Sequence, residues 1–230
     1  MASRAELVRR VAFGESDVIV TLFTEQMGSV AALARGARAS RKRFAGLEPM
    51  HQLEVEIDLV AGRDLGALVS SRLVRPRLGL TSSLACLDAA GAALRWLAAV
   101  APAHVAEPAL WAEIEGLLDE LDAPASAPAA MLGAFGLRLL AAAGWGLELA
   151  QCVRCGRACP ERSAGRLDLP AGGLVCRTCG GAPVLLTARE RRALVEAGHG
   201  VVDALARPED AALAARLVTE AIEVHGRGPR

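Results

Sequence analysis

The sequence predicts an α+β protein in which a small β-barrel precedes a helical region. Three observations support this fold class. Residues 1–76 largely alternate apolar and polar side chains, whereas residues 77–151 repeat apolar side chains at helical spacing. Two C-x-x-C pairs interrupt the helical part, a spacing typical of a metal-binding insertion. With 230 residues, 53% of them hydrophobic, the chain can form one large or two modest cores.

The first 76 residues contain five candidate strands separated by turns. Asp17–Thr24 is rich in β-branched residues, and Met50–Val60 has one apolar and one polar face. The other candidates are Leu7–Val11, Ser29–Ala34 and Gly66–Val74. A closed barrel is expected, because a short open sheet would leave two edges unpaired. The five-stranded OB barrel, which binds single-stranded nucleic acid, is the favoured fold, and an SH3-like barrel is the alternative.

A strongly basic segment joins the third and fourth candidate strands. Ala34–Phe44 reads A-R-G-A-R-A-S-R-K-R-F, with five cationic residues and no acidic one. Its small residues cannot cover those charges, so we expect a flexible, exposed loop able to lie along a polyanion. A solvated loop without function is the alternative, because charge runs are common on surfaces. The candidate nucleic-acid contacts are Arg35, Arg38, Arg41, Lys42 and Arg43, with Arg10 from the first strand.

Composition favours contact with phosphates over contact with bases. Aromatic residues make up 3% of the chain, and in the barrel only Phe13, Phe23 and Phe44 could stack on a base. Of these, Phe23 is expected in the core. The net charge is zero, but residues 1–80 and 151–230 each carry 12 basic and 9 acidic residues (+3), and residues 81–150 carry 2 and 8 (−6). The basic ends fit a polyanion, and the acidic middle fits contact with protein.

Residues 79–230 are predicted to be mainly helical. The candidate helices are Leu84–Val100, the segment around Leu110–Leu121, Pro128–Gly144, Thr187–Ala197 and Pro208–Val224. The third is apolar nearly all round and is expected at the centre of a bundle. Arg138 near its middle argues against a membrane span. The fourth helix opens with the capping-box pattern of Thr187 and Glu190.

Four of the six cysteines form two C-x-x-C pairs. Twenty residues separate Cys152 and Cys155 from Cys176 and Cys179. Two residues between cysteines let one turn direct both thiolates at one ion, so the four are predicted to hold one structural Zn²⁺ in a reducing cytoplasm. A redox pair would need only one C-x-x-C in a βαβ setting. Cys159 is expected to be a spare thiol near the site.

The predicted organisation is a barrel over residues 1–78 and a helical domain over 79–230, with the zinc insertion at 150–184. No histidine lies in the insertion, so a catalytic zinc with an open position is not expected. The chain contains no P-loop, H-E-x-x-H, G-x-S-x-G or paired acidic motif. An enzyme and a small-molecule substrate are therefore not expected.

The order of these parts resembles the RecO family of bacterial recombination mediators. The resemblance rests on four phrases: L-V-R-R-V-A-F-G-E-S-D-V-I-V-T-L-F-T (Leu7–Thr24), V-A-A-L-A-R-G-A-R (Val30–Arg38), G-L-E-P-M (Gly46–Met50), and F-G-L-R-L-L-A-A-A-G-W (Phe135–Trp145), which leads into C-V-R-C-G. It implies a cytoplasmic, nucleoid-associated protein that binds single- and double-stranded DNA and anneals complementary strands. It also implies partnership with RecR and with the acidic C-terminal tail of single-stranded DNA-binding protein, to load RecA in RecF-type gap repair. The alternative is an adaptor whose zinc ribbon and OB barrel bind proteins without annealing DNA.

Overall fold

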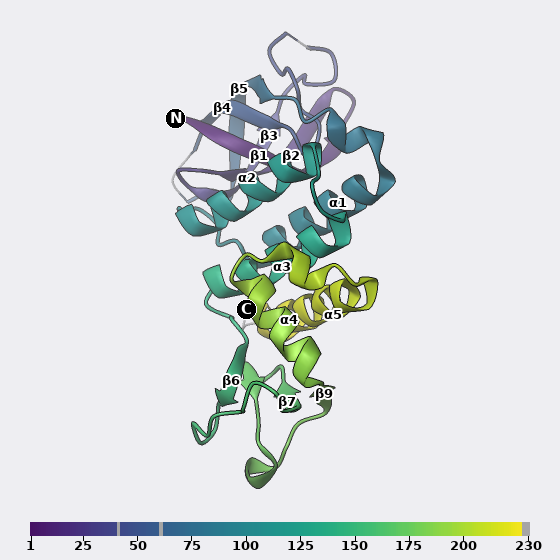
Figure 1. The fold of residues 1–230 in the computed structure, drawn as a ribbon. Coiled ribbons are helices and arrows are strands. Elements are labelled where there is room, and N and C mark those ends of the chain that lie inside the picture. The colour runs from purple at the N-terminus through teal and green to yellow at the C-terminus, as the bar shows by residue number, and fades with distance from the viewer. Residues whose placement is uncertain (41, 60–61, 227–230) are drawn as a thin grey trace. The chain divides into compact units, whose positions relative to one another are not determined.

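The computed structural model describes residues 1–40, 42–59 and 62–226, and the chain forms two compact units, Met1–Ala123 and Pro124–Arg230 (Figure 1). In the described residues, the first unit contains the five-stranded barrel and helices α1 and α2. The second contains helices α3, α4 and α5 and a small four-stranded sheet. The predicted α+β class is confirmed.

Five strands close the barrel in the order β1-β2-β3-β5-β4. They are β1 (Ala2–Phe13), β2 (Asp17–Thr24), β3 (Gly28–Ala34), β4 (Gln52–Asp58) and β5 (Leu65–Arg75). The pairings are antiparallel except for β3 with β5, which pair in parallel and complete the barrel. An OB-type barrel is therefore confirmed, with a core of aliphatic side chains such as Val20, Leu53 and Ile57.

The first strand is longer than the predicted Leu7–Val11. Its opening residues, Ala2–Glu6, pair with β4, while its later residues pair only with β2. Ser3 and Glu6 are both buried. Because both are polar, the alternation of apolar and polar residues does not reveal this part of the strand. The predicted end of β4 at Val60 lies outside the described residues.

Two helices pack with the barrel in the first unit. α1 (Leu84–Val100) and α2 (Pro108–Asp122) follow the predicted segments closely. Phe23 of β2 is buried, as expected, and its ring centroid lies 6.2 Å from that of Trp111 on α2. The connector between the helices also binds the barrel, because the Ser29 N–H donates to the Pro102 carbonyl at 3.1 Å.

A buried polar network joins the barrel to α2. The Arg77 side chain is fully buried and donates to both carboxylate oxygens of Glu6, at 2.6 and 2.9 Å. Its Nε also donates to Asp119 of α2 at 2.7 Å. Gln52 of β4 donates to Glu6 at 3.2 Å and to Glu115 of α2 at 2.7 Å. Burial raises the pKa of the Glu6 carboxyl, and the hydrogen bonds and charge of Arg77 partly oppose that effect.

The second unit is built around α3 (Pro128–Ala142), which packs against α4 (Ala188–Gly198) and α5 (Pro208–His225). Its central position in the bundle was predicted from its apolar surface and is confirmed. The predicted capping box is also present, since the Glu190 N–H donates to Thr187 Oγ1 at 3.2 Å and the Thr187 N–H donates to the Glu190 carboxylate at 2.7 Å. No described helix is long and apolar enough to cross a membrane.

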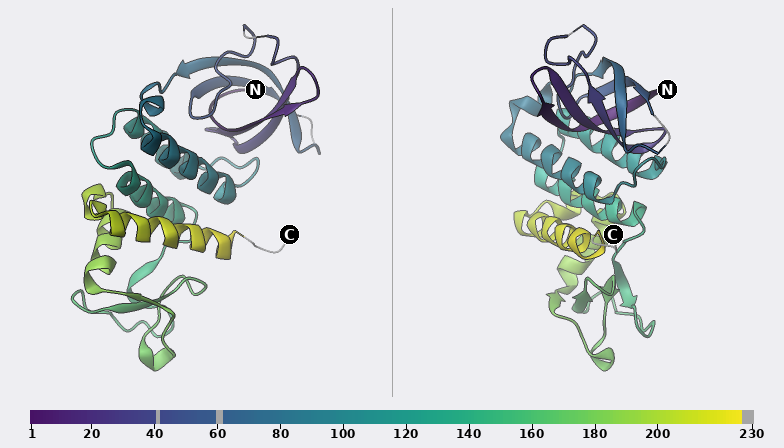
Figure 2. Two further views of the ribbon diagram at one scale, coloured as in Figure 1. Left: turned by 90° about the vertical axis from the view of Figure 1, so that its right-hand side faces the viewer. Right: turned by 180° about the vertical axis from the view of Figure 1, so that it is seen from behind.

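A small sheet lies between α3 and α4 in the sequence, and its short strands are seen beside the helices of the second unit in Figure 2. Its order is β6-β8-β7-β9. The strands are β6 (Glu148–Cys152), β7 (Gly165–Asp168), β8 (Gly173–Leu174) and β9 (Val184–Leu186). The four predicted cysteine ligands lie at the end of β6 and in the segments between these strands, and we call residues 148–186 the cysteine module.

Candidate nucleic-acid surface and metal centre

The basic loop between β3 and β4 is anchored at its beginning to the β1–β2 turn. The Gly36 N–H donates to the Asp17 carboxylate at 2.8 Å, and Gly36 adopts a positive φ of 69°. This hydrogen bond is the main reason that the pKa of Asp17 lies below its usual value. The Arg38 N–H donates to the Ser16 carbonyl at 3.0 Å, and the Arg38 guanidinium donates to the Glu15 carbonyl at 3.0 Å.

The end of the loop is anchored to β5. Arg43 Nε donates to the Val69 carbonyl at 2.7 Å, and the Ser71 N–H donates to the Arg43 carbonyl at 3.1 Å. Phe44 is only 4% exposed and packs in the barrel core. The expectation that Phe44 is available for base stacking is therefore wrong, because the loop uses this ring to fix its own end. Phe13, in contrast, is 53% exposed.

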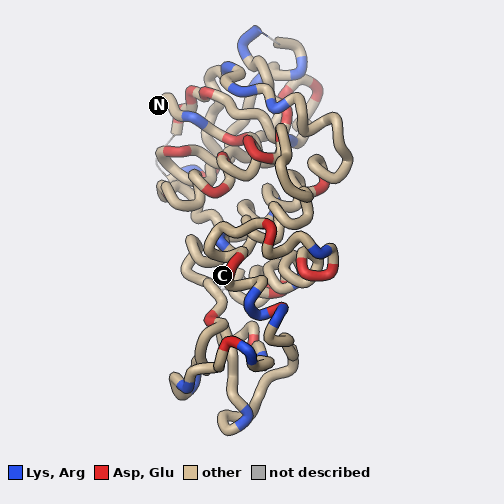
Figure 3. Tube along the Cα trace, viewed as in Figure 1, with Lys and Arg blue, Asp and Glu red and all other residues tan. Residues whose placement is uncertain are grey.

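The loop cations that the structure describes are exposed and lack acidic partners. Arg35, Arg38, Lys42 and Arg43 are all exposed, and no described carboxylate lies within ion-pair distance of any of them. The predicted contact Arg41 lies outside the described residues. Figure 3 shows the resulting gathering of positive residues on the loop at this end of the barrel. Uncompensated cations on an anchored loop provide positive potential that attracts a polyanion.

Arg10 has a different environment from the loop cations. Its guanidinium forms an ion pair with Glu48, with 2.6 Å between Nη1 and Oε1. Arg9 lies on another surface and, with Leu94 and Arg95 of α1, lines a groove of about 600 Å³. The two neighbouring arginines thus serve different surfaces, as alternation along a strand predicts.

Several of the described cations line two separate hollows at this end of the barrel. Arg35 and Arg43 line a hollow of about 380 Å³ together with Arg63, from the turn before β5. Arg10 and Arg38 line another hollow of about 390 Å³, and no residue lines both. Sequence analysis missed Arg63, because this cation lies beside Asp64 in a short turn and forms no basic run. Only the parallel pairing of β3 with β5 brings that turn beside the loop.

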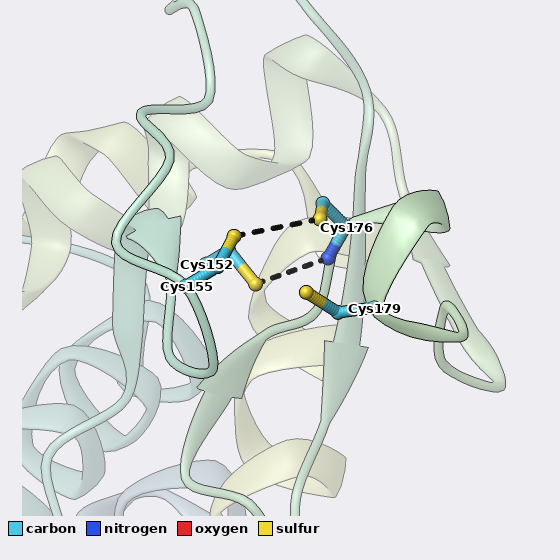
Figure 4. A group of neighbouring side chains, drawn as sticks. All are labelled: Cys152, Cys155, Cys176 and Cys179. Carbon is cyan, nitrogen blue, oxygen red and sulfur yellow. Dashed lines mark hydrogen bonds between the residues drawn. The ribbon is translucent and has the colours of Figure 1, made fainter.

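The four predicted cysteine ligands converge on one point (Figure 4). The Sγ atoms of Cys152, Cys155, Cys176 and Cys179 all lie within 4.8 Å of one another, and those of Cys155 and Cys176 are 3.8 Å apart. A tetrahedron with metal–sulfur bonds of about 2.3 Å has sulfur–sulfur edges of about 3.8 Å. This donor set therefore fits a single metal ion.

Two tight turns present these thiols. Gly156 and Gly180 follow the two pairs and adopt positive φ values of 69° and 106°, which side chains other than glycine rarely allow. The turns are also tied to each other, because the guanidinium groups of Arg154 and Arg157 donate to Cys179 O at 2.9 Å and Thr178 Oγ1 at 3.1 Å. Residues of the first turn thus hold the second in position.

Local hydrogen bonds change the acidity of the thiols. The Cys176 N–H donates to Cys152 Sγ at 3.4 Å, which is the main reason that the pKa of Cys152 falls to about 6. Hydrogen bonding with Cys155 and Cys176 raises the pKa of Cys179 to about 12. A divalent cation would stabilise all four thiolates together. Cys159 lies outside the cluster and is directed at the Ala164 carbonyl, 3.8 Å from its Sγ.

Comparison with known families covers both halves of the chain. Residues 1–77 match the family described as Recombination protein O N terminal, and residues 82–230 match Recombination protein O C terminal. The chain belongs to the RecO family. Family membership supports a role in DNA repair and recombination.

Similar curated proteins carry the same name, DNA repair protein RecO. The protein of Anaeromyxobacter sp. (strain K) is 40% identical over 211 residues, covering 91% of this chain and 79% of its own. That of Anaeromyxobacter dehalogenans (strain 2CP-C) is 39% identical over 220 residues, covering 94% and 86%. A more distant relative from Bifidobacterium longum (strain DJO10A) is 30% identical over 173 residues, covering 74% and 70%.

Proposed function

We propose that this RecO-family chain binds single- and double-stranded DNA through its barrel, residues 1–78, and anneals complementary strands. The observation that carries the proposal is the set of four described loop cations, which are exposed and have no described acidic partner, in a chain whose relatives are DNA repair proteins. Two DNA strands repel each other, and a cationic surface that neutralises both phosphate backbones without gripping the bases lowers that barrier. The proposed site of action is the bacterial nucleoid.

The proposed DNA contacts are Arg35, Arg38, Arg41, Lys42 and Arg43, with Arg10 at the margin of the surface. Each phosphate contact on a single strand contributes about −0.7 to the slope of log affinity against log salt concentration. Five contacts then give a contribution of roughly −3 to −4. Arg10 is expected to contribute less, because Glu48 already neutralises its charge.

The proposed partners follow from family membership. The chain would act with RecR and with the acidic C-terminal tail of single-stranded DNA-binding protein, so that RecA is loaded onto coated single strands at gaps. RecA is an indirect partner in this scheme. The acidic middle of the chain gives limited support to the alternative, a protein-binding adaptor, because two acidic residues of α2 are used internally: Glu115 pairs with Arg4 and Asp119 with Arg77.

We also propose that the cysteine centre holds Zn²⁺ in a structural role. Cys152, Cys155, Cys176 and Cys179 would supply four thiolates, the donor set of closed structural zinc sites. Four protein ligands leave no open position for a substrate or an activated water. The ion would supply the positive charge that allows the four thiolates to lie together.

The deciding experiment is annealing of complementary oligonucleotides coated with single-stranded DNA-binding protein. Wild type should accelerate annealing, and the variant with all five loop cations changed to Ala should not. The matched control changes four exposed arginines that each form an ion pair outside the loop, Arg72, Arg192, Arg207 and Arg216, to Ala. The control should anneal as wild type does. If wild type fails to accelerate annealing while its metal centre is intact, the proposed function is overturned in favour of the adaptor.

A further inference from the structure

The hollow lined by Arg35, Arg43 and Arg63 is formed by three separate segments of the barrel. Arg35 follows β3, Arg43 belongs to the anchored end of the loop, and Arg63 lies in the turn before β5. Its volume of about 380 Å³ lies in the range of small-ligand sites. The parallel pairing of Leu33 with Ala67 brings these segments together at one end of the barrel.

Three cationic residues and one acidic residue are among the described residues that line this hollow, so its charges are not balanced. All three arginines are exposed, and none has a described carboxylate within ion-pair distance. Asp58 is the only acidic residue among the described residues that line the hollow. The Val69 carbonyl holds Arg43 in place, so this guanidinium is already oriented. Such a group of like charges is stabilised when a phosphate neutralises it.

Part of the lining of the hollow is aliphatic. Leu33 is half-buried and Leu65 is 42% exposed, and both line the hollow beside the arginines. A bare phosphate or a duplex backbone makes no use of such a surface, because the bases of a duplex are stacked inside it. An unpaired nucleotide presents both a phosphate and an apolar base face, and so matches both halves of the hollow.

We propose that this hollow is a subsite for one unpaired nucleotide, with its phosphates on Arg35, Arg43 and Arg63 and its base against Leu33 and Leu65. The proposal rests on the proposed DNA-binding function and adds Arg63 and Leu65 to it. The subsite also gives this end of the barrel a preference for single strands. None of the described residues that line the hollow is aromatic.

The test measures binding of oligo-dT and of a duplex of equal length across a salt series, with four variants of the β4–β5 hairpin. Arg63→Ala should make the oligo-dT slope shallower by about 0.7, because one phosphate contact is lost. Leu65→Ala should leave the slope unchanged and weaken oligo-dT binding by roughly three- to tenfold, with little change for the duplex. The controls are Arg72→Ala and Val74→Ala, exposed residues of β5 that do not line the hollow, and both should bind as wild type does.

Two outcomes overturn the proposal. One is an Arg63→Ala slope equal to that of wild type, and the other is an equal loss of single-strand and duplex binding in Leu65→Ala. Either result leaves the proposed function standing, provided that the quintuple loop variant still loses DNA binding. If wild type itself binds neither oligonucleotide, the proposed function fails first.

Discussion

The buried junction between the barrel and α2 differs from the cysteine module in how its polar groups are satisfied. At the junction, the buried Arg77 has Glu6 and Asp119 as partners, so its charge is paired within the chain. In the module, four thiols converge on one point, and as thiolates they repel one another. The junction is therefore complete as folded, whereas the module, by our proposal, takes up a cation from solution. The buried charges of the junction already have partners, whereas the thiols of the module form the site proposed for a metal ion.

The basic loop extends this comparison to the surface. Arg77 and Arg35 are the same residue type in the same barrel, but Arg77 is buried among carboxylates and Arg35 is exposed without one. The first is expected to affect stability and the second to affect binding. Variants of Arg77 should therefore change stability, and variants of Arg35 should change DNA binding.

Metal removal should have the largest effect, and it should affect only the cysteine module. Binding of structural zinc supplies about 10–16 kcal/mol in small zinc peptides, so a chelator should unfold the cysteine module. Hydrogen exchange should show loss of protection across residues 148–186, with the barrel unchanged. Cys176→Ser should behave like the chelated protein. Cys159→Ser, which changes a thiol outside the cluster, should keep full protection. A module that stays protected without metal would contradict this account.

Breaking the junction should have the next largest effect. Arg77→Met leaves the carboxylate of Glu6 buried without its cation, and we expect the free energy of unfolding to fall by about 3–5 kcal/mol. Arg72→Met removes an exposed pair with Glu54 and should cost no more than about 1 kcal/mol. Denaturant unfolding of both variants measures the difference. Equal losses would show that the buried network has no special role.

A smaller effect is expected from the acidity of Glu6. Its pKa in the folded chain is raised above the ordinary value of 4.5, so the folded state holds this proton more tightly than the unfolded chain does. The resulting stabilisation is present below the unfolded-state pKa and is lost as pH rises through the folded-state pKa. Across that window the stability of wild type should fall with rising pH relative to Glu6→Gln. The opposite slope in a denaturant series at several pH values would mean that Arg77 outweighs burial.

Much of the fold could be predicted because its elements follow strong local patterns. The periodicity of Leu84–Val100 and the Thr187 capping box mark helices that the structure contains. The strands of the cysteine module were not predicted, because they have two to five residues and no measurable alternation. The first strand was predicted too short because Glu6 is charged and yet buried. Its partner Arg77 lies 71 residues away, beyond any local pattern.

The candidate site was predictable to the extent that its residues are neighbours in sequence. The two C-x-x-C pairs specify a shared centre through spacing alone, and the basic loop is a continuous run. Arg63 is different, since only the closure of the barrel by β3 and β5 places it beside Arg35. The burial of Phe44 likewise depends on the backbone pairing of Phe44 with Ser71.

The most direct test of the central claim is the salt dependence of single-strand binding by wild type and by the variant with the five loop cations reversed to Glu. If the unpaired cations of the loop bind phosphates, the variant should lose affinity, and the magnitude of its log–log slope should decrease by roughly 3 to 4. The control with Arg72, Arg192, Arg207 and Arg216 changed to Ala should keep the wild-type slope. A loop variant that binds with an unchanged slope would contradict the assignment of this loop as the DNA-binding surface.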